Sequence, residues 1–304
     1  SSGGEIVLKG YGIRLNEFLD DELYKRIEEL RLACFEYDGT NFKFELDFKL
    51  AGAIIKEVSP LRNIDEFTYW YDDKLIGYMG INDFGGRSLE VNGMVHPDYR
   101  KMGIFNRLFS LVLDEWGKRK TTEMLLLTDK SSQSGRGFIK STGALYNHTE
   151  FEMVLDNKKH KNIKTRINLK VASNNDAQEI ARQNAIYFNE DISSEDLLDV
   201  EEERKRGFHI FLAEYSGNVI GKVHLHISNK EGGIFGLGIL PEYRNMGLGR
   251  ELLNGSVEKL IDLGADNIFL QVDGENETAL GLYTSCGFQV KYAMEYYRLK
   301  REKT

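Results

Sequence analysis

Hydrophobic and polar residues follow two periods along this chain, one typical of strands and one typical of helices. The clearest segment covers residues 234–254 and reads IFGLGILPEYRNMGLGRELLN. Its apolar start predicts a buried strand that Pro241 ends, because proline cannot donate to a sheet ladder. Apolar residues then recur at helical spacing from Leu248 to Ile261. The segment therefore predicts a strand, a glycine-containing loop and a helix.

The rest of the second half predicts more strands and helices in alternation. Strands are expected at 167–171, 208–214, 219–227, 268–272 and 288–300, and helices at 176–188, 195–206 and 277–285. Ser216-Gly217-Asn218 predicts a hairpin turn between two of the strands. Strands alternating with helices indicate an α/β layer fold with a mixed sheet.

The first half of the chain repeats motifs of the second half at one constant offset. Pro97, Tyr99, Arg100, Met102 and Gly103 each stand 144 positions before Pro241, Tyr243, Arg244, Met246 and Gly247. Strands are expected here at 66–71, 74–81, 89–95, 124–128 and 151–155, and helices at 20–35, 48–58, 104–116 and 135–141. A period this long predicts a duplicated domain rather than a solenoid.

The duplication divides the chain into two expected domains. The first covers 5–155 and the second 167–304. Between them, residues 156–166 read DNKKHKNIKTR, a polar and basic composition that is typical of a linker.

Length, charge and cysteine content narrow the class of protein. The chain has 304 residues and a net charge of -8, which argues against a general nucleic-acid partner. No apolar run reaches the roughly 18 residues of a membrane helix, so no membrane association is expected. Two cysteines are too few for a disulfide framework, so a cytoplasmic location is expected. The His and Cys residues show no metal-ligand spacing, and no metal is expected.

The loop at 244–249 has the composition of a phosphate site. Gly247 and Gly249 let the backbone approach a ligand closely. The helix that follows begins with unpaired N–H groups at the positive end of its dipole. Together these features predict a cradle for a phosphate group.

The order of these motifs resembles the pyrophosphate loop of the GNAT superfamily of acyl-CoA-dependent N-acyltransferases. The strand is followed by Pro-Glu-Tyr-Arg and then by Arg-x-x-Gly-x-Gly, and the later Asn276, Leu282-Tyr283 and Gly287-Phe288 resemble the family's ending. The resemblance implies two tandem GNAT domains, each a mixed, mostly antiparallel sheet flanked by helices. It also implies acetyl-CoA as co-substrate and a primary amine of a small molecule or peptide as acceptor.

The resemblance assigns most cofactor contacts to the second copy. The implied pyrophosphate loop consists of Arg244, Asn245, Met246, Gly247, Leu248 and Gly249. The backbone of Gly238, Ile239 and Leu240 would pair with the pantetheine arm, and the Ile239 N–H would polarise the thioester carbonyl. Three assignments have an alternative. Glycine at 238 would equally serve close packing. Arg250 would contact a phosphate or lie exposed on its helix, and Asn276 would contact pantetheine, cap the helix from Glu277, or both.

The catalytic residues are less completely implied. Tyr283 matches the tyrosine that protonates the departing thiolate, as a phenol is able to do. For the base, His224 and His226 share one face of a predicted strand, and His226 is the candidate chosen. Glu231 and a water chain to bulk solvent are the alternatives.

The first copy departs from this pattern. At the offset of 144, Phe105 replaces Gly249, Ile139 replaces Tyr283 and Ser132 replaces Asn276. An isoleucine cannot donate a proton, so the first copy is expected to be degenerate. A non-catalytic acyl-CoA sensor or scaffold is the main alternative for the whole chain. A transferase that uses aminoacyl-tRNA is disfavoured by the intact loop and the acidic charge.

Overall fold

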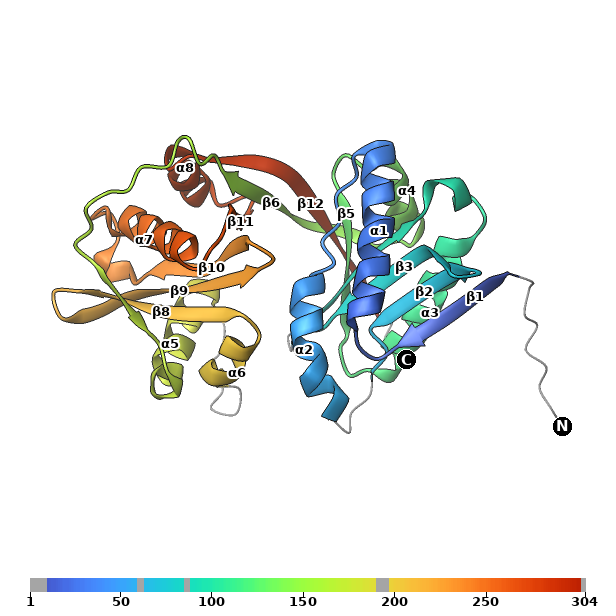
Figure 1. The fold of residues 1–304 in the computed structure, drawn as a ribbon, viewed down its shortest axis with the longest axis horizontal. Coiled ribbons are helices and arrows are strands. Elements are labelled where there is room, and N and C mark those ends of the chain that lie inside the picture. The colour runs from blue at the N-terminus through green and yellow to red at the C-terminus, as the bar shows by residue number, and fades with distance from the viewer. Residues whose placement is uncertain (1–9, 59–62, 85–87, 190–196, 302–304) are drawn as a thin grey trace. The chain divides into compact units, whose positions relative to one another are not determined.

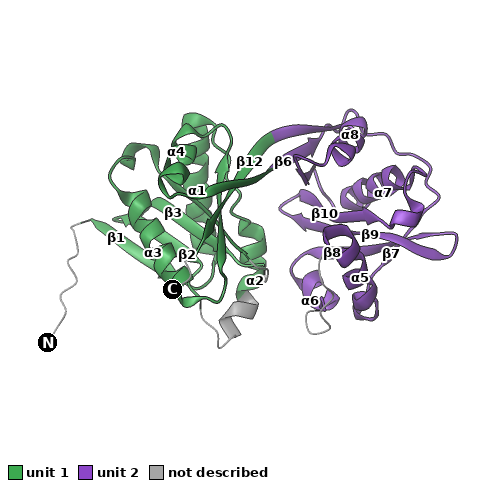
Figure 2. Ribbon diagram, turned by 180° about the vertical axis from the view of Figure 1, so that it is seen from behind, with its two compact units in different colours: residues 1–149, 292–304 green, residues 150–291 purple. Residues whose placement is uncertain are grey.

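The computed structural model describes residues 10–58, 63–84, 88–189 and 197–301, with the side chains of 54–58 excepted. The chain forms two compact units (Figure 2). Unit 1 contains residues 1–149 and 292–304, and unit 2 contains residues 150–291.

From α1 onward, unit 1 contains strands and helices in the order that the sequence predicts (Figure 1). Its strands are β1 (Tyr11–Asn16), β2 (Glu66–Tyr71), β3 (Lys74–Asn82), β4 (Ser88–Val95) and β5 (Glu123–Asp129), and its helices are α1 (Asp21–Asp38), α2 (Leu46–Val58), α3 (Ile104–Lys118) and α4 (Gln133–Ser141). The short 3₁₀ helix η1 (Pro97–Tyr99) lies between β4 and α3.

Unit 2 repeats this series. Its strands are β7 (Asn168–Val171), β8 (Phe208–Tyr215), β9 (Asn218–Ser228), β10 (Glu231–Ile239) and β11 (Asn267–Asp273), and its helices are α5 (Ala177–Phe188), α6 (Val200–Lys205), α7 (Leu248–Asp262) and α8 (Glu277–Ser285). The 3₁₀ helices η2 (Asn174–Asp176) and η3 (Pro241–Tyr243) precede α5 and α7. Residues 190–196, where the predicted helix 195–206 would begin, lie outside the described residues.

Strand pairing is the same in both units. In unit 1, β1 to β4 pair in order as antiparallel neighbours, β4 pairs with β5 in parallel, and β5 pairs with the second half of β12 (Phe288–Lys300). In unit 2, β7 to β10 form the antiparallel series, β10 pairs with β11 in parallel, and β11 pairs with the second half of β6 (Leu145–Leu155). Each sheet is therefore mixed and mostly antiparallel, which confirms the predicted fold class.

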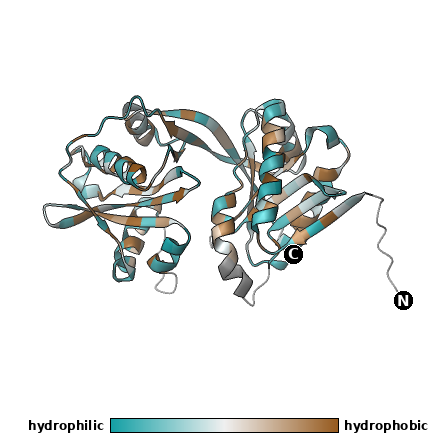
Figure 3. Ribbon diagram, in the orientation of Figure 1, coloured by the Kyte–Doolittle hydropathy of each residue, from teal (hydrophilic) through white to brown (hydrophobic). Residues whose placement is uncertain are grey.

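Helices cover both faces of each sheet because each strand presents apolar side chains on alternate sides. In unit 2, α7 packs against β9 and β10, with Val223, Leu252 and Leu270 in the shared core. The other face carries α5 and α6, where Ile180 and Val200 pack against β8. Figure 3 shows the corresponding mixture of polar and apolar residues along α1 of unit 1. The α5 face of unit 2 is the one that bears the polar side chains discussed below.

The boundaries of the observed units differ from those of the predicted domains, because they fall within the two long strands β6 and β12. The sequence pattern places 5–155 in one domain and 167–304 in the other, whereas residues from Tyr292 onward belong to unit 1. The reason is that 288–300 forms one continuous strand whose second half pairs with β5. Strand β1 was not expected from the sequence.

Residues 156–166, expected as a linker, pack within unit 2. His160 Nε2 lies 2.6 Å from Glu258 Oε1 on α7, and Asn254 Nδ2 donates to the carbonyl oxygen of Lys161 at 2.8 Å. The polar and basic residues of 156–166 therefore belong to a segment that polar contacts hold against α7, and not to a free linker.

Candidate functional site

Strands β10 and β11 part at the end where the loop of 244–249 begins. Their parallel pairing covers only Glu231–Ile234 against Asn267–Leu270, although β10 continues to Ile239. The pairing of β10 with β9 also shifts register between Phe235 and Gly238. Past Ile234 the β11 side of β10 therefore has no ladder partner on β11. The backbone N–H and C=O groups on this side of β10 are therefore available to form hydrogen bonds with another partner.

The loop after β10 turns sharply before α7. Asn245 has a φ of 61° and Gly247 a φ of 79°, while Lys101 and Gly103 of unit 1 have φ values of 63° and 76°. The left-handed conformation strains residues other than glycine. Both loops thus have one backbone path, and each ends as the N-cap of its helix, α7 or α3. The free N–H groups of a helix start favour an anion there.

Two arginines hold the loop of unit 2. Arg244 donates from Nε to the carbonyl oxygen of Ile239 at 2.9 Å. Arg166 donates from Nη2 to the carbonyl oxygen of Met246 at 2.7 Å and from Nε to Glu251 at 2.8 Å. Arg166 therefore places a guanidinium beside Gly247. Sequence reasoning assigned it only to the linker, because nothing local links residue 166 to residue 246.

Two further predicted site residues, Asn276 and Tyr283, lie at the start of α8 and within it. The side chain of Asn276 accepts a hydrogen bond from the backbone N–H of Ala279 at 3.1 Å, so it is the N-cap of α8. Tyr283 is partly buried against the α7 core, with its ring centroid 6.3 Å from that of Phe288. Burial raises the pKa of the Tyr283 phenol, which keeps its proton in place at neutral pH.

The candidate histidines lie on the α5 face of β9. The His226 ring packs at a tilt against that of Phe208 with ring centroids 4.6 Å apart, and its Nε2 lies 3.1 Å from the carbonyl oxygen of Arg206. His224 instead lies with its Nε2 3.2 Å from the Nζ of Lys222. Lys222 pairs across the strands with Gly238, whereas His226 pairs with Gly233. Of the three side chains, Lys222 is the one beside the Gly238 backbone, and sequence reasoning missed it.

Gly238 also accommodates an aromatic ring. A Cβ atom at this position would come within 2.3 Å of the ring of Tyr187, which lies in the last turn of α5. The packing of Tyr187 thus requires glycine at 238. The third candidate base, Glu231, begins β10 and accepts a hydrogen bond from Asn267 Nδ2 at 2.8 Å.

Comparison with known proteins assigns the two units to one family. The family model described as Acetyltransferase (GNAT) family matches residues 24–144 and again residues 174–288. The chain belongs to the acetyltransferase (GNAT) family. Membership implies acyl-CoA-dependent N-acyl transfer, with a small molecule or peptide as the class of acceptor.

Solved structures resemble the fold of this GNAT chain over nearly its whole length. A tandem GNAT protein from the clavulanic acid biosynthesis pathway matches 97% of this chain and 99% of its own, with a TM-score of 0.70 and 14% identity. A GCN5-related N-acetyltransferase from Sphaerobacter thermophilus covers 95% of both chains, with a TM-score of 0.69 and 18% identity. An acetyltransferase from the GNAT family from Colwellia psychrerythraea covers 95% and 100%, with a TM-score of 0.60 and 14% identity. Likenesses at this identity concern the fold alone.

The first GNAT copy retains a cleft despite its altered residues. The cleft has a volume of about 310 Å³ and lies where β4 and β5 part, with pairing that ends at Val91 and Leu126. Phe105 packs edge-on against Phe138 in its wall, with centroids 4.4 Å apart. Ser132 caps α4 just as Asn276 caps α8. The replacements of Gly249 and Asn276 therefore leave a cleft in unit 1.

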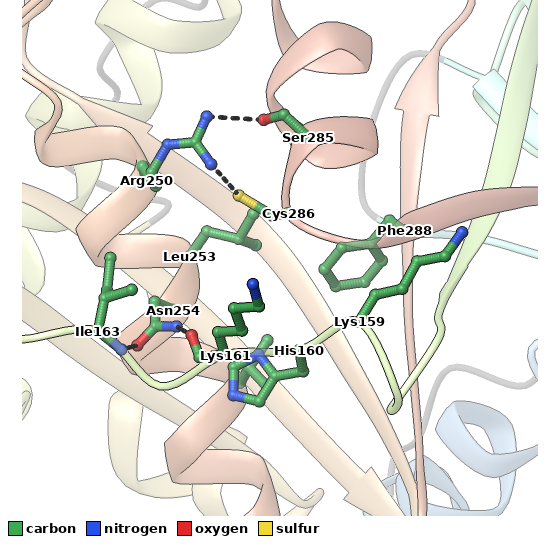
Figure 4. A pocket seen from close by; sticks show the side chains of 11 residues that line it. Lys159, His160, Lys161, Ile163, Arg250, Leu253, Asn254, Ser285, Cys286 and Phe288 are labelled. Atoms are coloured by element: carbon green, nitrogen blue, oxygen red, sulfur yellow. Dashed lines mark hydrogen bonds between the residues drawn. The ribbon is translucent and has the colours of Figure 1, made fainter.

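Arg250 takes part in a second cavity, of about 170 Å³, between α7, the end of α8 and residues 159–163 (Figure 4). Its guanidinium donates to Ser285 Oγ at 2.7 Å and to Cys286 Sγ at 3.3 Å. Arg250 thus ties α7 to α8. Cys286 is partly exposed here, while Cys34 in unit 1 is buried.

Two general properties complete the description of the site. Among the residues that the structure describes, no three His, Cys, Asp or Glu side chains gather closely enough to hold a metal ion. Within the same residues, no helix is both long and apolar enough to cross a membrane.

Proposed function

We propose that this protein transfers an acetyl group from acetyl-CoA to a primary amine of a small molecule or peptide, and that unit 2 is the working copy. The observation that carries the proposal is the parting of β10 and β11 directly before a left-handed glycine loop and a helix start. An extended arm that ends in a pyrophosphate fits this arrangement, because strand edges bind extended chains and helix starts bind phosphates.

The proposed binding site uses backbone groups more than side chains. The backbone of Gly238, Ile239 and Leu240 would pair with the pantetheine arm, and residues 244–249 would hold the pyrophosphate. The side-chain contacts support this division, since the Arg244 guanidinium is already bonded to Ile239 and the Asn276 side chain to Ala279. Arg166 adds a positive charge beside Gly247 that the sequence pattern did not indicate.

The proposed chemistry assigns one proton transfer to Tyr283. A thiolate leaves when the amine replaces it at the acyl carbon, and the protonated phenol donates its proton to that sulfur. Ile139 stands at the matching position of unit 1, where it is buried, and it has no proton to give. This difference supports unit 2 rather than unit 1 as the catalytic copy.

The test begins with calorimetric titration of acetyl-CoA into the intact chain. Gly247→Trp is compared with the matched Gly103→Trp in unit 1. We expect binding that Gly247→Trp abolishes and Gly103→Trp leaves in place, followed by release of CoA thiol with at least one member of a panel of primary amines. Binding that only Gly103→Trp abolishes would reverse the assignment of the copies. Binding without thiol release from any amine would favour the sensor alternative.

A further inference from the structure

A buried lysine lies beside the proposed acyl site. Lys222 is 0% exposed and stands on β9 directly opposite Gly238. Its Nζ donates to the carbonyl oxygen of Gly236 at 3.0 Å and lies 3.2 Å from His224 Nε2. Gly236 has a φ of 54° and belongs to the register shift of β10, so its carbonyl is free to meet the lysine. The head group thus lies at the irregular part of the strand that would bind the acyl donor.

Unit 1 shows how the same face accommodates a lysine that has only a structural role. Tyr78 stands at the position that matches Lys222, and Lys49 reaches the same region from α2. There the Lys49 ammonium lies 2.9 and 3.0 Å from the two carboxylate oxygens of Glu66. Buried charges normally have such a partner. Among the described residues, Lys222 has no carboxylate partner, so its burial is not explained by an ion pair.

The groups packed around Lys222 do not neutralise the positive charge of its ammonium form. From α5, the ring centroid of Tyr187 lies 5.7 Å from Nζ, and the Tyr187 hydroxyl donates to Gln183. Glu179 on the same helix is bonded to Arg182 at 2.7 Å. From β10, the carbonyl oxygen of Gly236 contacts the Lys222 Nζ, and from β9 the His224 ring contacts it. Arg244 and Glu242 lie beyond, near enough to influence Tyr187.

Burial therefore dominates the ionisation of this pair. It lowers the pKa of Lys222 to about 8. Burial, followed by the charge of Lys222, lowers the pKa of His224 to about 3, so the imidazole is neutral in the physiological range. A base is most effective when its pKa lies near the working pH. Of the two groups, the lysine meets that condition.

We propose that Lys222 is the general base that removes the proton from the acceptor ammonium in the reaction of unit 2. The ammonium gives its proton to the neutral Lys222 amine, and the freed amine attacks the thioester carbon. The C–N bond forms, the C–S bond breaks, and the thiolate takes the Tyr283 proton. The second proton that the nitrogen loses on becoming an amide replaces the one given by Tyr283. Lys222 then returns its proton to solvent. This role rests on the acyl transfer proposed above for unit 2.

Distance along β9 favours Lys222 over His226. The two residues are four positions apart, or roughly 13 Å at the usual rise of a strand. Lys222 is opposite Gly238 and His226 is opposite Gly233. His226 therefore lies well back from the end of β10 that would bind the acyl group.

The rival role for a buried lysine is to anchor a carboxylate of the acceptor, and the pH profile separates the two. A base works when it is neutral, so the rate rises as the pH passes upward through the pKa. An anchor works when it is charged, so the rate falls over the same range. Lys222→Arg sharpens the contrast, because arginine keeps the charge but does not lose its proton.

The experiment measures CoA thiol release from acetyl-CoA between pH 6 and 9.5, with primary alkylamines and with methoxyamine. The nitrogen of methoxyamine is already unprotonated at neutral pH and needs no base. The enzymes compared are wild type, Lys222→Met, Lys222→Arg, His226→Gln and Lys230→Met. Lys230 is exposed and serves as the control for loss of a lysine. Circular dichroism and acetyl-CoA affinity verify that each variant is folded.

For alkylamines we expect kcat/KM of the wild type to rise with pH, and both Lys222 variants to lose about 100-fold or more. Turnover of methoxyamine and affinity for acetyl-CoA should stay within about threefold. Full activity of Lys222→Arg, a rate that falls with pH, equal losses with methoxyamine, or a loss confined to His226→Gln would each overturn the inference while leaving acyl transfer intact. Failure of the wild type to turn over any amine would overturn both proposals.

Discussion

Arg244 bonds the carbonyl oxygen of Ile239 through Nε at 2.9 Å, and Arg100 makes the same bond to Val95 at 3.0 Å. The arginine thus fastens the start of the loop to the end of the strand in both copies. We expect Arg244→Met to weaken acetyl-CoA binding about 10- to 100-fold, because losing a charged hydrogen bond costs about 1.5–3 kcal/mol. Calorimetry measures this effect, and Arg100→Met is the matched variant. Equal losses in the two variants would contradict the assignment of the donor site to unit 2.

The loop glycines should respond differently to alanine. Gly247 has a φ of 79°, so Gly247→Ala should destabilise unit 2 by about 1–2 kcal/mol. Gly249 lies inside α7, and a Cβ there would meet Leu282 at an ordinary 3.7 Å. Gly249→Ala should therefore be neutral or stabilise the helix by up to about 1 kcal/mol. Urea unfolding followed by far-ultraviolet circular dichroism compares the two, and equal destabilisation would argue against the backbone explanation.

The two buried lysines give a second matched pair. Lys49→Met leaves Glu66 buried without its partner, which should cost about 3–5 kcal/mol. Lys222→Met removes a charge that has no carboxylate partner among the described residues, so it should be neutral or stabilising. Both tryptophans, Trp70 and Trp116, lie in unit 1. Tryptophan fluorescence therefore follows the unfolding of unit 1 in Lys49→Met. Circular dichroism reports both units, so the part of its transition that fluorescence does not show belongs to unit 2. A large loss in Lys222→Met would indicate a hidden partner.

The free energy of unfolding of unit 2 should change with pH in the alkaline range, because Lys222 titrates there. Its pKa falls from 10.5 in a free lysine to about 8 in the folded protein. Between these values the unfolded chain binds a proton that the folded chain has released, so stability rises with pH from about 8 to 10.5. The gain amounts to at most about 3 kcal/mol. Urea unfolding of unit 2 at both pH values should show a smaller gain in Lys222→Met, and an identical gain would mean that Lys222 titrates normally.

Much of the local structure follows from local patterns. The helix at 277–285 was predicted with the observed bounds, because a capping asparagine and helical spacing lie close together in the sequence. The duplication at 144 positions predicted two copies of one sheet, and the pairing order of both units confirms it. The strand, loop and helix at 234–254 likewise follow from the apolar pattern and from Pro241, Gly247 and Gly249.

Other features depend on contacts between distant residues. Strand β1 was missed, although Tyr11, Ile13 and Leu15 alternate with small or polar residues, and its place in the sheet depends on pairing with the distant β2. The assignment of 292–304 to unit 1 depends on pairing between Met294 and Asp129, which no local period encodes. Arg166 reaches Met246 across 80 positions. Each of these relationships becomes visible only when the chain has folded.

The sequence by itself determined the element types, the duplication and the family, because spacing and glycine positions act over a few neighbouring residues. Only the tertiary structure decided which polar groups lose contact with water. Strand alternation in the sequence predicts that Lys222 lies on the same face as His224 and His226. It does not predict that Lys222 is buried beneath Tyr187. Burial depends on helices brought over the sheet from elsewhere in the chain, and burial is what changes the chemistry of a lysine.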